Sequence, residues 1–114
     1  MSVSDGFREY ALEQLGRVQP VTARPMFGGI GLYSRGLFFA LIDDDVLYFK
    51  VDDETRDTFR AAGMSPFRPF ADRPDQVMQY YEVPPDALDD TDVLGVWLGR
   101  ALGAATRARR RKKR

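Results

Sequence analysis

The stretch RPMFGGIGLY, residues 24–33, decides how the rest of the chain is interpreted, because three glycines stand there among large apolar side chains. It has neither the G-x-G-x-x-G spacing of a dinucleotide-binding loop nor the Lys-Ser or Lys-Thr pair of a P-loop. Strand-like sequence follows it, whereas a phosphate-binding loop leads into a helix N-terminus. We therefore interpret residues 24–33 as one strand, in which Gly28, Gly29 and Gly31 permit a bulge or the close approach of a helix.

The residues before this strand predict a helix. Apolar side chains recur every three or four positions between Phe7 and Val18, which is the spacing of one helical face. Ser2 or Ser4 would cap the N-terminus of this helix, and Pro20 lies beyond its end.

The residues after the strand predict a sheet and two further helices. The short turns YSRG and DDD lead into extended runs over 37–42 and 46–51, which favours antiparallel hairpins. Asp52 or Asp53 would cap a helix that Gly63 ends. The remaining expected elements are strands over 66–70 and 77–83 and a last helix with the apolar stripe Leu94, Trp97, Leu98, Ala101, Leu102 and Ala105. This order, α-β-β-β-α-β-β-α, predicts a two-layer α+β fold with helices packed on one face of an antiparallel sheet.

The composition excludes much catalytic chemistry. The chain has 114 residues, enough for one domain, and contains no cysteine and no histidine. Thiol nucleophiles, thiolate zinc sites and histidine general bases are therefore excluded. Only lysine or carboxylate chemistry is left for an enzyme. We expect a protein without enzymatic activity, cofactor or bound metal.

Two acidic clusters support the alternative of a carboxylate-based, divalent-cation-dependent hydrolase. Asp43, Asp44 and Asp45 are consecutive, and residues 52–54 read Asp-Asp-Glu. Carboxylate oxygens suit magnesium and calcium. Consecutive residues of a tight turn point in different directions, however, so few of them can converge on one ion. We therefore favour a solvated hairpin turn for the first cluster, and we interpret the acidic residues 86–92 as a helix start.

The charge of the chain is strongly polarised, although the formal net charge is zero. Residues 1–106 contain ten basic and seventeen acidic residues, a balance of −7, and the last eight residues carry +7. We expect one domain over 1–106 and a flexible basic tail over 107–114. Such a tail can neutralise phosphates and release their counterions, but it cannot read a base sequence. Its candidate nucleic-acid contacts are Arg107, Arg109, Arg110, Arg111, Lys112, Lys113 and Arg114.

Membrane and export signals are missing from the sequence. No apolar run approaches the ~20 residues that a membrane-spanning helix needs, and the N-terminus lacks the basic and apolar regions of a signal peptide. We expect a cytoplasmic protein that does not bind a membrane. It would be a monomer or a homodimer, and a structural homodimer formed through the edge strand 66–70 is a further alternative.

Aromatic side chains are concentrated in the expected strands and include Phe38, Phe39, Tyr48, Phe49, Phe67, Phe70, Tyr80 and Tyr81. Most of them must fill the core. On the outer face of the sheet, Tyr48 and Lys50, with Tyr33 or Tyr80, are expected to form an exposed patch. Such a patch would suit a protein partner or the stacking of single-stranded bases.

With these residues placed, the chain resembles the TfoX N-terminal domain family, named for the Sxy/TfoX regulators of natural competence in bacteria. The resemblance rests on RPMFGGIGLYSRGLFFALIDDDVLYFKVD (24–52), GMSPF (63–67) and YYEVP (80–84), followed by a helix with Trp97 and Ala101. It extends in order over nearly the whole chain. It implies an α-β3-α-β2-α two-layer fold like that of small secretion-chaperone-type domains.

The resemblance also implies a function. Members of the family are not known as enzymes, and the full-length competence regulators are similar to transcriptional co-activators that work with the cyclic-AMP receptor protein at promoters. Those regulators carry a second, helical domain that this sequence lacks, so we expect a stand-alone N-terminal module. It would regulate transcription as an adaptor that contacts the transcription machinery or a receptor-protein-like regulator, with non-specific DNA attraction by the tail. The family signature, taken as the candidate partner surface, is Arg24, Met26, Phe27, Gly28, Gly29, Gly31, Tyr33, Tyr48, Lys50 and Tyr81.

Overall fold

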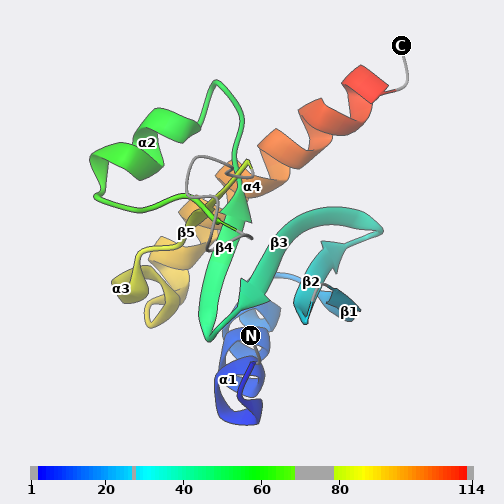
Figure 1. The fold of residues 1–114 in the computed structure, drawn as a ribbon, viewed down its shortest axis with the longest axis vertical. Helices are drawn as coiled ribbons and strands as arrows, with labels where there is room; N and C mark the ends of the chain where they lie inside the picture. The colour runs from blue at the N-terminus through cyan, green and yellow to red at the C-terminus, as the bar shows by residue number, and fades with distance from the viewer. Residues whose placement is uncertain (1–2, 27, 69–78, 113–114) are drawn as a thin grey trace.

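The structure, a computed structural model, describes residues 3–26, 28–68 and 79–112. Figure 1 labels the elements in chain order, which are α1 (Asp5–Val18), β1 (Thr22–Met26), β2 (Gly29–Ser34), β3 (Leu37–Asp43), β4 (Val46–Lys50), α2 (Arg56–Ala61), β5 (Tyr80–Glu82), α3 (Pro85–Leu88) and α4 (Thr91–Lys112). The strands form one sheet in the order β1-β2-β3-β4-β5, and every neighbouring pair is antiparallel.

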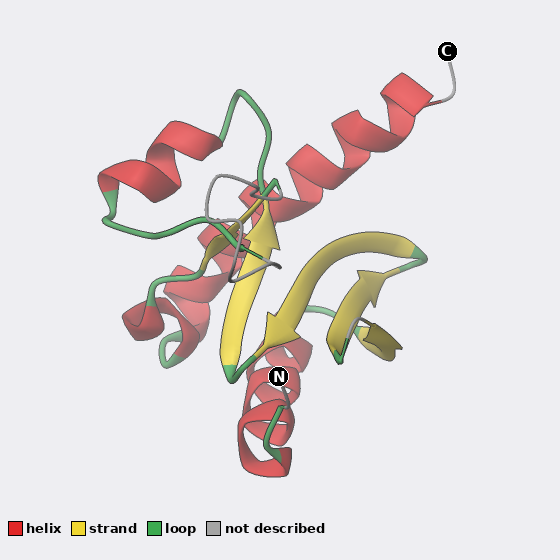
Figure 2. Cartoon of the chain, viewed as in Figure 1, coloured by secondary structure: helices red, strands yellow, loops and turns green. Residues whose placement is uncertain are grey.

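Helices α1 and α4 cover one face of this sheet and lie behind it in the view of Figure 2. The main core fills the space between the two layers. Phe39, Ile42 and Phe49 of the sheet pack there with Leu15 of α1 and Leu98 of α4, and none of these side chains is more than 1% exposed. Each buried side chain of this size stabilises the fold by roughly 1.5–3 kcal/mol. The predicted two-layer α+β fold is confirmed.

Helix α1 forms as its sequence predicts. The hydroxyl oxygen of Ser4 accepts the backbone N–H of Phe7 at 3.2 Å, so Ser4 is the N-cap. Ala11 and Leu15 are completely buried, which places the predicted apolar stripe against the core.

The prediction of one strand over residues 24–33 is wrong, because the chain reverses direction inside this stretch. Residues up to Met26 belong to β1 and residues from Gly29 belong to β2, and these two residues lie opposite each other in the ladder. Gly28 has φ +79°, a left-handed conformation that glycine adopts without steric cost. Phe27 lies outside the described residues. The sequence therefore encodes one more hairpin than expected.

The glycines of β2 make room for neighbouring strands, whereas the sequence suggested a helix. A Cβ atom on Gly29 would lie 2.3 Å from the carbonyl oxygen of Ile42 in β3. One on Gly31 would lie 3.0 Å from Cε of Met26 in β1. The register between β2 and β3 shifts at Leu32/Tyr33, so the irregularity of the ladder lies directly after Gly31 in the sequence.

The other two hairpins form as predicted, with tight turns whose residues have positive φ. Arg35 and Gly36 have φ of 51° and 79°, and Asp44 and Asp45 have φ of 51° and 58°. Two consecutive residues with positive φ define the type I′ turn, whose twist matches that of the flanking strands.

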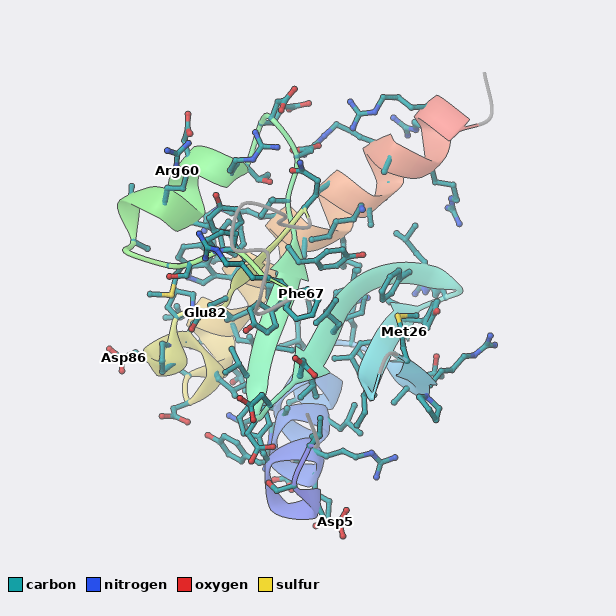
Figure 3. All side chains as sticks on the ribbon, viewed as in Figure 1. Asp5, Met26, Arg60, Phe67, Glu82 and Asp86 are labelled. Atoms are coloured by element: carbon teal, nitrogen blue, oxygen red, sulfur yellow. The ribbon has the colours of Figure 1, made fainter. Side chains whose placement is uncertain are left out.

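The strand predictions near β5 are only partly correct. Within the run predicted over 77–83, only Tyr80–Glu82 is a strand among the described residues 79–83, and residues 69–78 lie outside the described residues. In place of an edge strand over 66–70, the described residues show a single bridge between Pro66 and Tyr81. Phe67 donates its N–H to Tyr80 at 2.8 Å. Its side chain lies over the face of the sheet that is opposite the helices, as Figure 3 shows.

The helices after β4 differ from the predictions at their ends. Helix α2 begins after Thr55, and the side chain of Asp52 instead accepts the N–H of Glu54 at 3.0 Å in the preceding turn. Gly63 has φ +81°, as expected for the residue that ends the helix.

At the C-terminal end, the short α3 precedes α4, and the carboxylate of Asp90 accepts backbone N–H groups at the start of α4. Helix α4 then continues to Lys112. Residues 107–112, which we expected to belong to a flexible tail, are helical in the structure, and residues 113 and 114 lie outside the described part of the chain.

Candidate functional site

The C-terminal end of α4 is fixed to the rest of the domain by Arg107. Its guanidinium binds the carboxylate of Asp52 with two contacts, Nε to Oδ2 at 2.5 Å and Nη2 to Oδ1 at 3.1 Å. The same Nε lies 3.0 Å from Oε2 of Glu54, a largely exposed side chain. Asp52 is nearly buried, and its hydrogen bond from Arg107 lowers its pKa. This pair explains why the helix continues into the basic segment.

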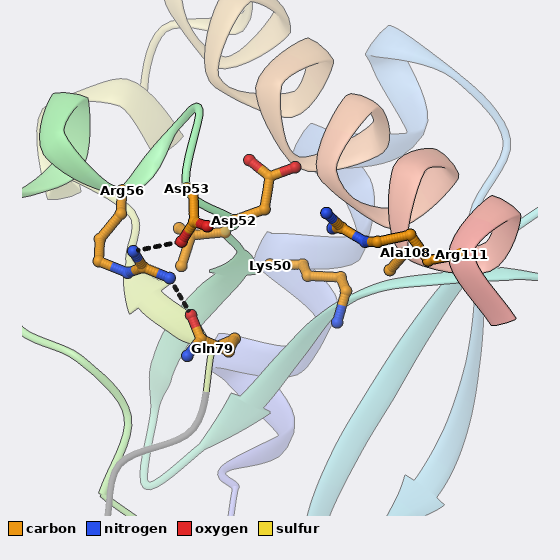
Figure 4. A pocket seen from close by; sticks show the side chains of 8 residues that line it. Lys50, Asp52, Asp53, Arg56, Gln79, Ala108 and Arg111 are labelled. Carbon is orange, nitrogen blue, oxygen red and sulfur yellow. Dashed lines mark hydrogen bonds and ion pairs between the residues drawn. The ribbon is translucent and has the colours of Figure 1, made fainter.

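A cleft of about 260 Å³ lies beside this ion pair. It is lined by Lys50, Val51, Asp52, Asp53, Arg56, Gln79, Ala108 and Arg111. Figure 4 shows that Arg111 reaches from α4 toward the end of β4, where Lys50 lies. Arg56 of α2 donates to Asp53 at 3.0 Å and to Gln79. Cations from three elements therefore surround one concave surface, and the two aspartates of its lining are each paired with an arginine.

The predicted nucleic-acid residues do not form one uniform cluster. Arg107 is occupied by Asp52, and Arg111 lines the cleft described above. Arg109 lies on another side of α4, where it lines a second groove together with Arg35. Arg110 is exposed. The backbone of Lys112 belongs to α4, whereas Lys113 and Arg114 lie outside the described residues. The basic end of α4, defined here as Arg109, Arg110 and Arg111, thus presents cations in several directions.

The sheet face opposite the helices carries a row of aromatic rings with a cation at each end, which we call the aromatic row. The guanidinium of Arg24 lies 5.3 Å from the ring centre of Tyr33, which stacks on Phe38 at 5.1 Å. Phe38 meets Tyr80 at 5.6 Å, and the ammonium of Lys50 lies 5.0 Å from the ring of Tyr80. These distances suit aromatic and cation–π contacts.

The expected exposed aromatic patch is only partly present. Tyr33, Tyr48 and Lys50 do lie on the outer face and are half-buried. Tyr80, however, is only 3% exposed, and burial raises its pKa. Tyr48 packs on Phe67 with ring centres 4.9 Å apart, and burial is the main reason that its pKa is raised to about 12. The available surface is therefore narrower than the sequence predicts.

The signature residues divide between three places. Arg24, Met26, Gly29, Gly31, Tyr33, Tyr48 and Lys50 lie on the outer face, by the alternation and register of the strands. Gly28 lies in the β1–β2 turn, and Phe27 is outside the described residues. Tyr81 faces the helices, where its ring centre is 6.3 Å from that of Phe59, so its assignment to a partner surface is wrong.

The sequence did not reveal the ion pair of Asp52 with Arg107, nor that Phe38 lies in the middle of the aromatic row, between Tyr33 and Tyr80. The first two residues are separated by 55 positions, so no local pattern connects them. Phe38 lies in the run GLFFALI, which is apolar on both faces and gives no alternation that would show its direction.

Several carboxylates of the two acidic clusters are engaged in contacts that stabilise the fold. Asp44 and Asp45 form the β3–β4 turn, and Asp45 Oδ1 accepts the N–H of Ser4 at 2.7 Å. Asp52 and Glu54 are held by Arg107. Within residues 3–26, 28–68 and 79–112, no group of three potential ligands is arranged to hold a metal ion. None of the described helices has the length and apolar character needed to cross a bilayer.

Comparison with known proteins agrees with the resemblance seen in the sequence. The model of the TfoX N-terminal domain matches residues 13–105, which include every strand, the second part of α1 and most of α4. No curated protein matches the chain. Because the matched region extends over most of the sequence, this chain belongs to the TfoX N-terminal domain family.

Proposed function

We propose that this protein is a non-enzymatic regulatory adaptor of the competence-regulator type, which contacts a protein partner and attracts nucleic acid without reading its sequence. The observation that carries the proposal is the clamp between Arg107 and Asp52, because it holds the basic end of α4 in a fixed position beside Lys50 and Arg56. Membership of the TfoX N-terminal domain family supports the regulatory role.

The nucleic-acid part of the proposal rests on the geometry of the cations. Arg109, Arg110 and Arg111 are held on a helix and point in different directions, so they can contact phosphates on one or two strands. Arginine binds phosphate oxygens through a planar fork of donors. No recognition helix with base-reading side chains is implied, and phosphate contacts alone carry no sequence information. The expected binding is therefore weak, salt-dependent and insensitive to base sequence.

The protein part of the proposal rests on the aromatic row. Half-buried Tyr33 and Phe38 lie between Arg24 and the region of Lys50. Aromatic and arginine side chains are enriched at the centres of protein interfaces. By the family relationship, the partner would belong to the transcription machinery or be a regulator like the cyclic-AMP receptor protein.

The absence of catalysis is also part of this proposal. It is supported by the lack of histidine and cysteine in the sequence and by the engagement of the second acidic cluster with Arg107. A carboxylate held in a two-contact ion pair with arginine has little capacity left to bind a metal or to accept a proton.

A salt-dependence measurement tests the nucleic-acid part. The triple variant Arg109→Ala, Arg110→Ala and Arg111→Ala should bind single- and double-stranded DNA more weakly than the wild type at low salt. If each arginine contacts one phosphate, the slope of log K against log salt concentration should become shallower by about 2 to 3.

The matched control removes three arginines from other surfaces, Arg8, Arg17 and Arg60, and changes the net charge by the same amount. For this control variant, the slope of log K against log salt concentration should remain close to that of the wild type. Equal losses in the two triple variants would show that net charge alone attracts DNA, and they would contradict the assignment to the end of α4.

A further inference from the structure

Another concave surface lies at the opposite end of β4 from the basic cleft. The basic cleft adjoins Lys50, the last residue of β4, whereas this groove adjoins Val46, the first. Its volume is about 290 Å³, and α1, β4, β5 and α3 enclose it. Typical small-molecule pockets hold roughly 300–1,000 Å³, so this groove is at the lower limit of that range. Its size suits one or two large side chains.

The floor of the groove is apolar. It is formed by Phe7, Val46, Leu47, Val83, Pro85 and Leu88. Phe7 and Val46 are half-buried, and Pro85 is exposed, so part of this apolar surface remains in contact with water. Tyr10 borders the same groove and is 39% exposed, which makes it one of the large hydrophobic side chains that the domain leaves at its surface.

The rim of the groove is acidic. Asp45 comes from the β3–β4 turn, Glu82 from β5 and Asp89 from the end of α3, and no lysine or arginine is among the residues that line the groove. Asp45 accepts a backbone N–H from Ser4, and Asp89 accepts the hydroxyl of Tyr10, but these donors are uncharged. Across the described residues, none of the three carboxylates forms an ion pair. Figure 3 labels Glu82 and, on the neighbouring α3, Asp86, which adds to the negative charge of this end.

The apolar floor and the acidic rim together indicate which kind of ligand the groove can bind. An apolar floor stabilises an aliphatic or aromatic side chain through burial. Three uncompensated carboxylates attract cations and repel phosphates, so a nucleic acid is disfavoured here. The described residues around the groove also lack the ligand arrangement that a metal ion needs. A peptide segment with an apolar anchor and flanking Lys or Arg side chains satisfies both the floor and the rim.

We propose that the acidic-rimmed groove, defined by Tyr10, Val46, Glu82, Leu88 and Asp89 with Asp45, binds a basic segment of a protein partner through one large apolar anchor side chain. The inference rests on the proposed function only in assuming a protein partner, and it adds a docking surface distinct from the aromatic row. The anchor lies on the floor between α1 and α3, and the flanking cations of the partner face the three carboxylates.

Selection from a random peptide library displayed on phage tests this inference with the full chain as target. The enriched peptides should carry a net positive charge and a large apolar residue. Their affinity is then measured by fluorescence anisotropy with the wild type and with the double variant Glu82→Gln and Asp89→Asn, which keeps side-chain shape and removes two rim charges. The selected peptides should bind this variant about tenfold more weakly.

Two further variants make the test specific. Glu13→Gln with Asp57→Asn removes the same charge from exposed sites on α1 and α2, and it should change the affinity less than about twofold. Val46→Thr keeps the branched shape of the floor but adds a hydroxyl, and it should weaken binding without changing its salt dependence.

Three results would overturn the inference. Enriched peptides without basic residues would contradict the rim, and equal weakening by the two charge variants would show diffuse attraction to an acidic surface. Sedimentation that reveals self-association lost in the Glu82→Gln and Asp89→Asn variant would assign the groove to the basic end of a second copy. DNA binding by the basic end of α4 is measured separately and would survive each of these outcomes.

Discussion

Removing the side chain of Arg107 is expected to destabilise the whole domain. In the variant Arg107→Ala, the carboxylate of Asp52 keeps its bonds from the N–H of Glu54 and the hydroxyl of Thr55 but loses its only cationic partner among the described residues. The side chain of Asp52 is 9% exposed, so water can replace the guanidinium only in part.

The magnitude follows from the burial of the two partners. Breaking a fully buried ion pair costs about 3–5 kcal/mol, because the remaining charge is left without compensation. Arg107 is 31% exposed, and two other donors still serve Asp52, so a smaller loss is appropriate. We expect the free energy of unfolding to fall by about 1–3 kcal/mol. For a chain of this length, the melting temperature should fall by about 4–13 °C.

The stability that Arg107→Ala loses should depend on pH, and the direction of this dependence follows from the pKa of Asp52. Arg107 lowers the pKa of Asp52 below its ordinary value of 3.8, so the stabilisation is present above the unfolded-state pKa. It is lost as the pH falls through the lower, folded-state pKa. The difference between wild type and Arg107→Ala should therefore be constant near neutral pH and should shrink below pH 3.8.

Urea unfolding followed by the fluorescence of Trp97, the single tryptophan of the chain, measures this difference. Arg109→Ala is the matched control, since it removes the same charge two residues away without breaking an ion pair seen in the described structure. The reasoning is refuted if Arg107→Ala is as stable as Arg109→Ala at neutral pH, or if the difference between them grows in acid.

Further predictions concern the glycines and one tyrosine. Gly29→Ala should destabilise the sheet by more than about 2 kcal/mol in thermal unfolding, because its Cβ would lie 2.3 Å from the carbonyl oxygen of Ile42, whereas Gly16→Ala on α1 meets nothing within 4 Å and should stabilise the protein by about 0.5–1 kcal/mol. Equal effects of the two alanines would contradict the register of β2 and β3. Tyr48 should ionise near pH 12 in an ultraviolet titration, because burial raises its folded-state pKa. Its contribution to stability should therefore be lost as the pH rises from 10 toward 12. Ionisation of every tyrosine near pH 10 would show that Tyr48 is not packed under Phe67.

The sequence predicts those parts of the fold that local chemistry determines. Ser4 caps α1 because a hydroxyl oxygen at that position accepts an orphan N–H, and Gly63 ends α2 because glycine tolerates the left-handed conformation. The turns at Arg35–Gly36 and Asp44–Asp45 were also predictable from their short length. In each case the decisive interaction involves neighbours in the chain.

The remaining parts depend on contacts between distant residues. The hairpin at Gly28 was missed because the apolar residues on both sides of the glycines continue a strand-like pattern, so only the pairing of β1 with β2 shows where the chain turns. The helical course of the basic end of α4 was not expected, because like charges in a run of arginines repel one another. The contact that holds this end is the ion pair of Arg107 with Asp52, which lies far away in the sequence between β4 and α2. The acidic-rimmed groove likewise combines residues of four segments.

The uninterrupted course of α4 sets a length scale for this domain. Its first turn follows Asp89 at the acidic-rimmed groove, and Arg111 lies roughly 30 Å farther along at a rise of about 1.5 Å per residue. That span corresponds to about nine base pairs of duplex DNA. Because α4 runs without interruption and Arg107 joins its C-terminal part to Asp52, the proposed peptide groove and the proposed phosphate contacts would be held at a constant separation.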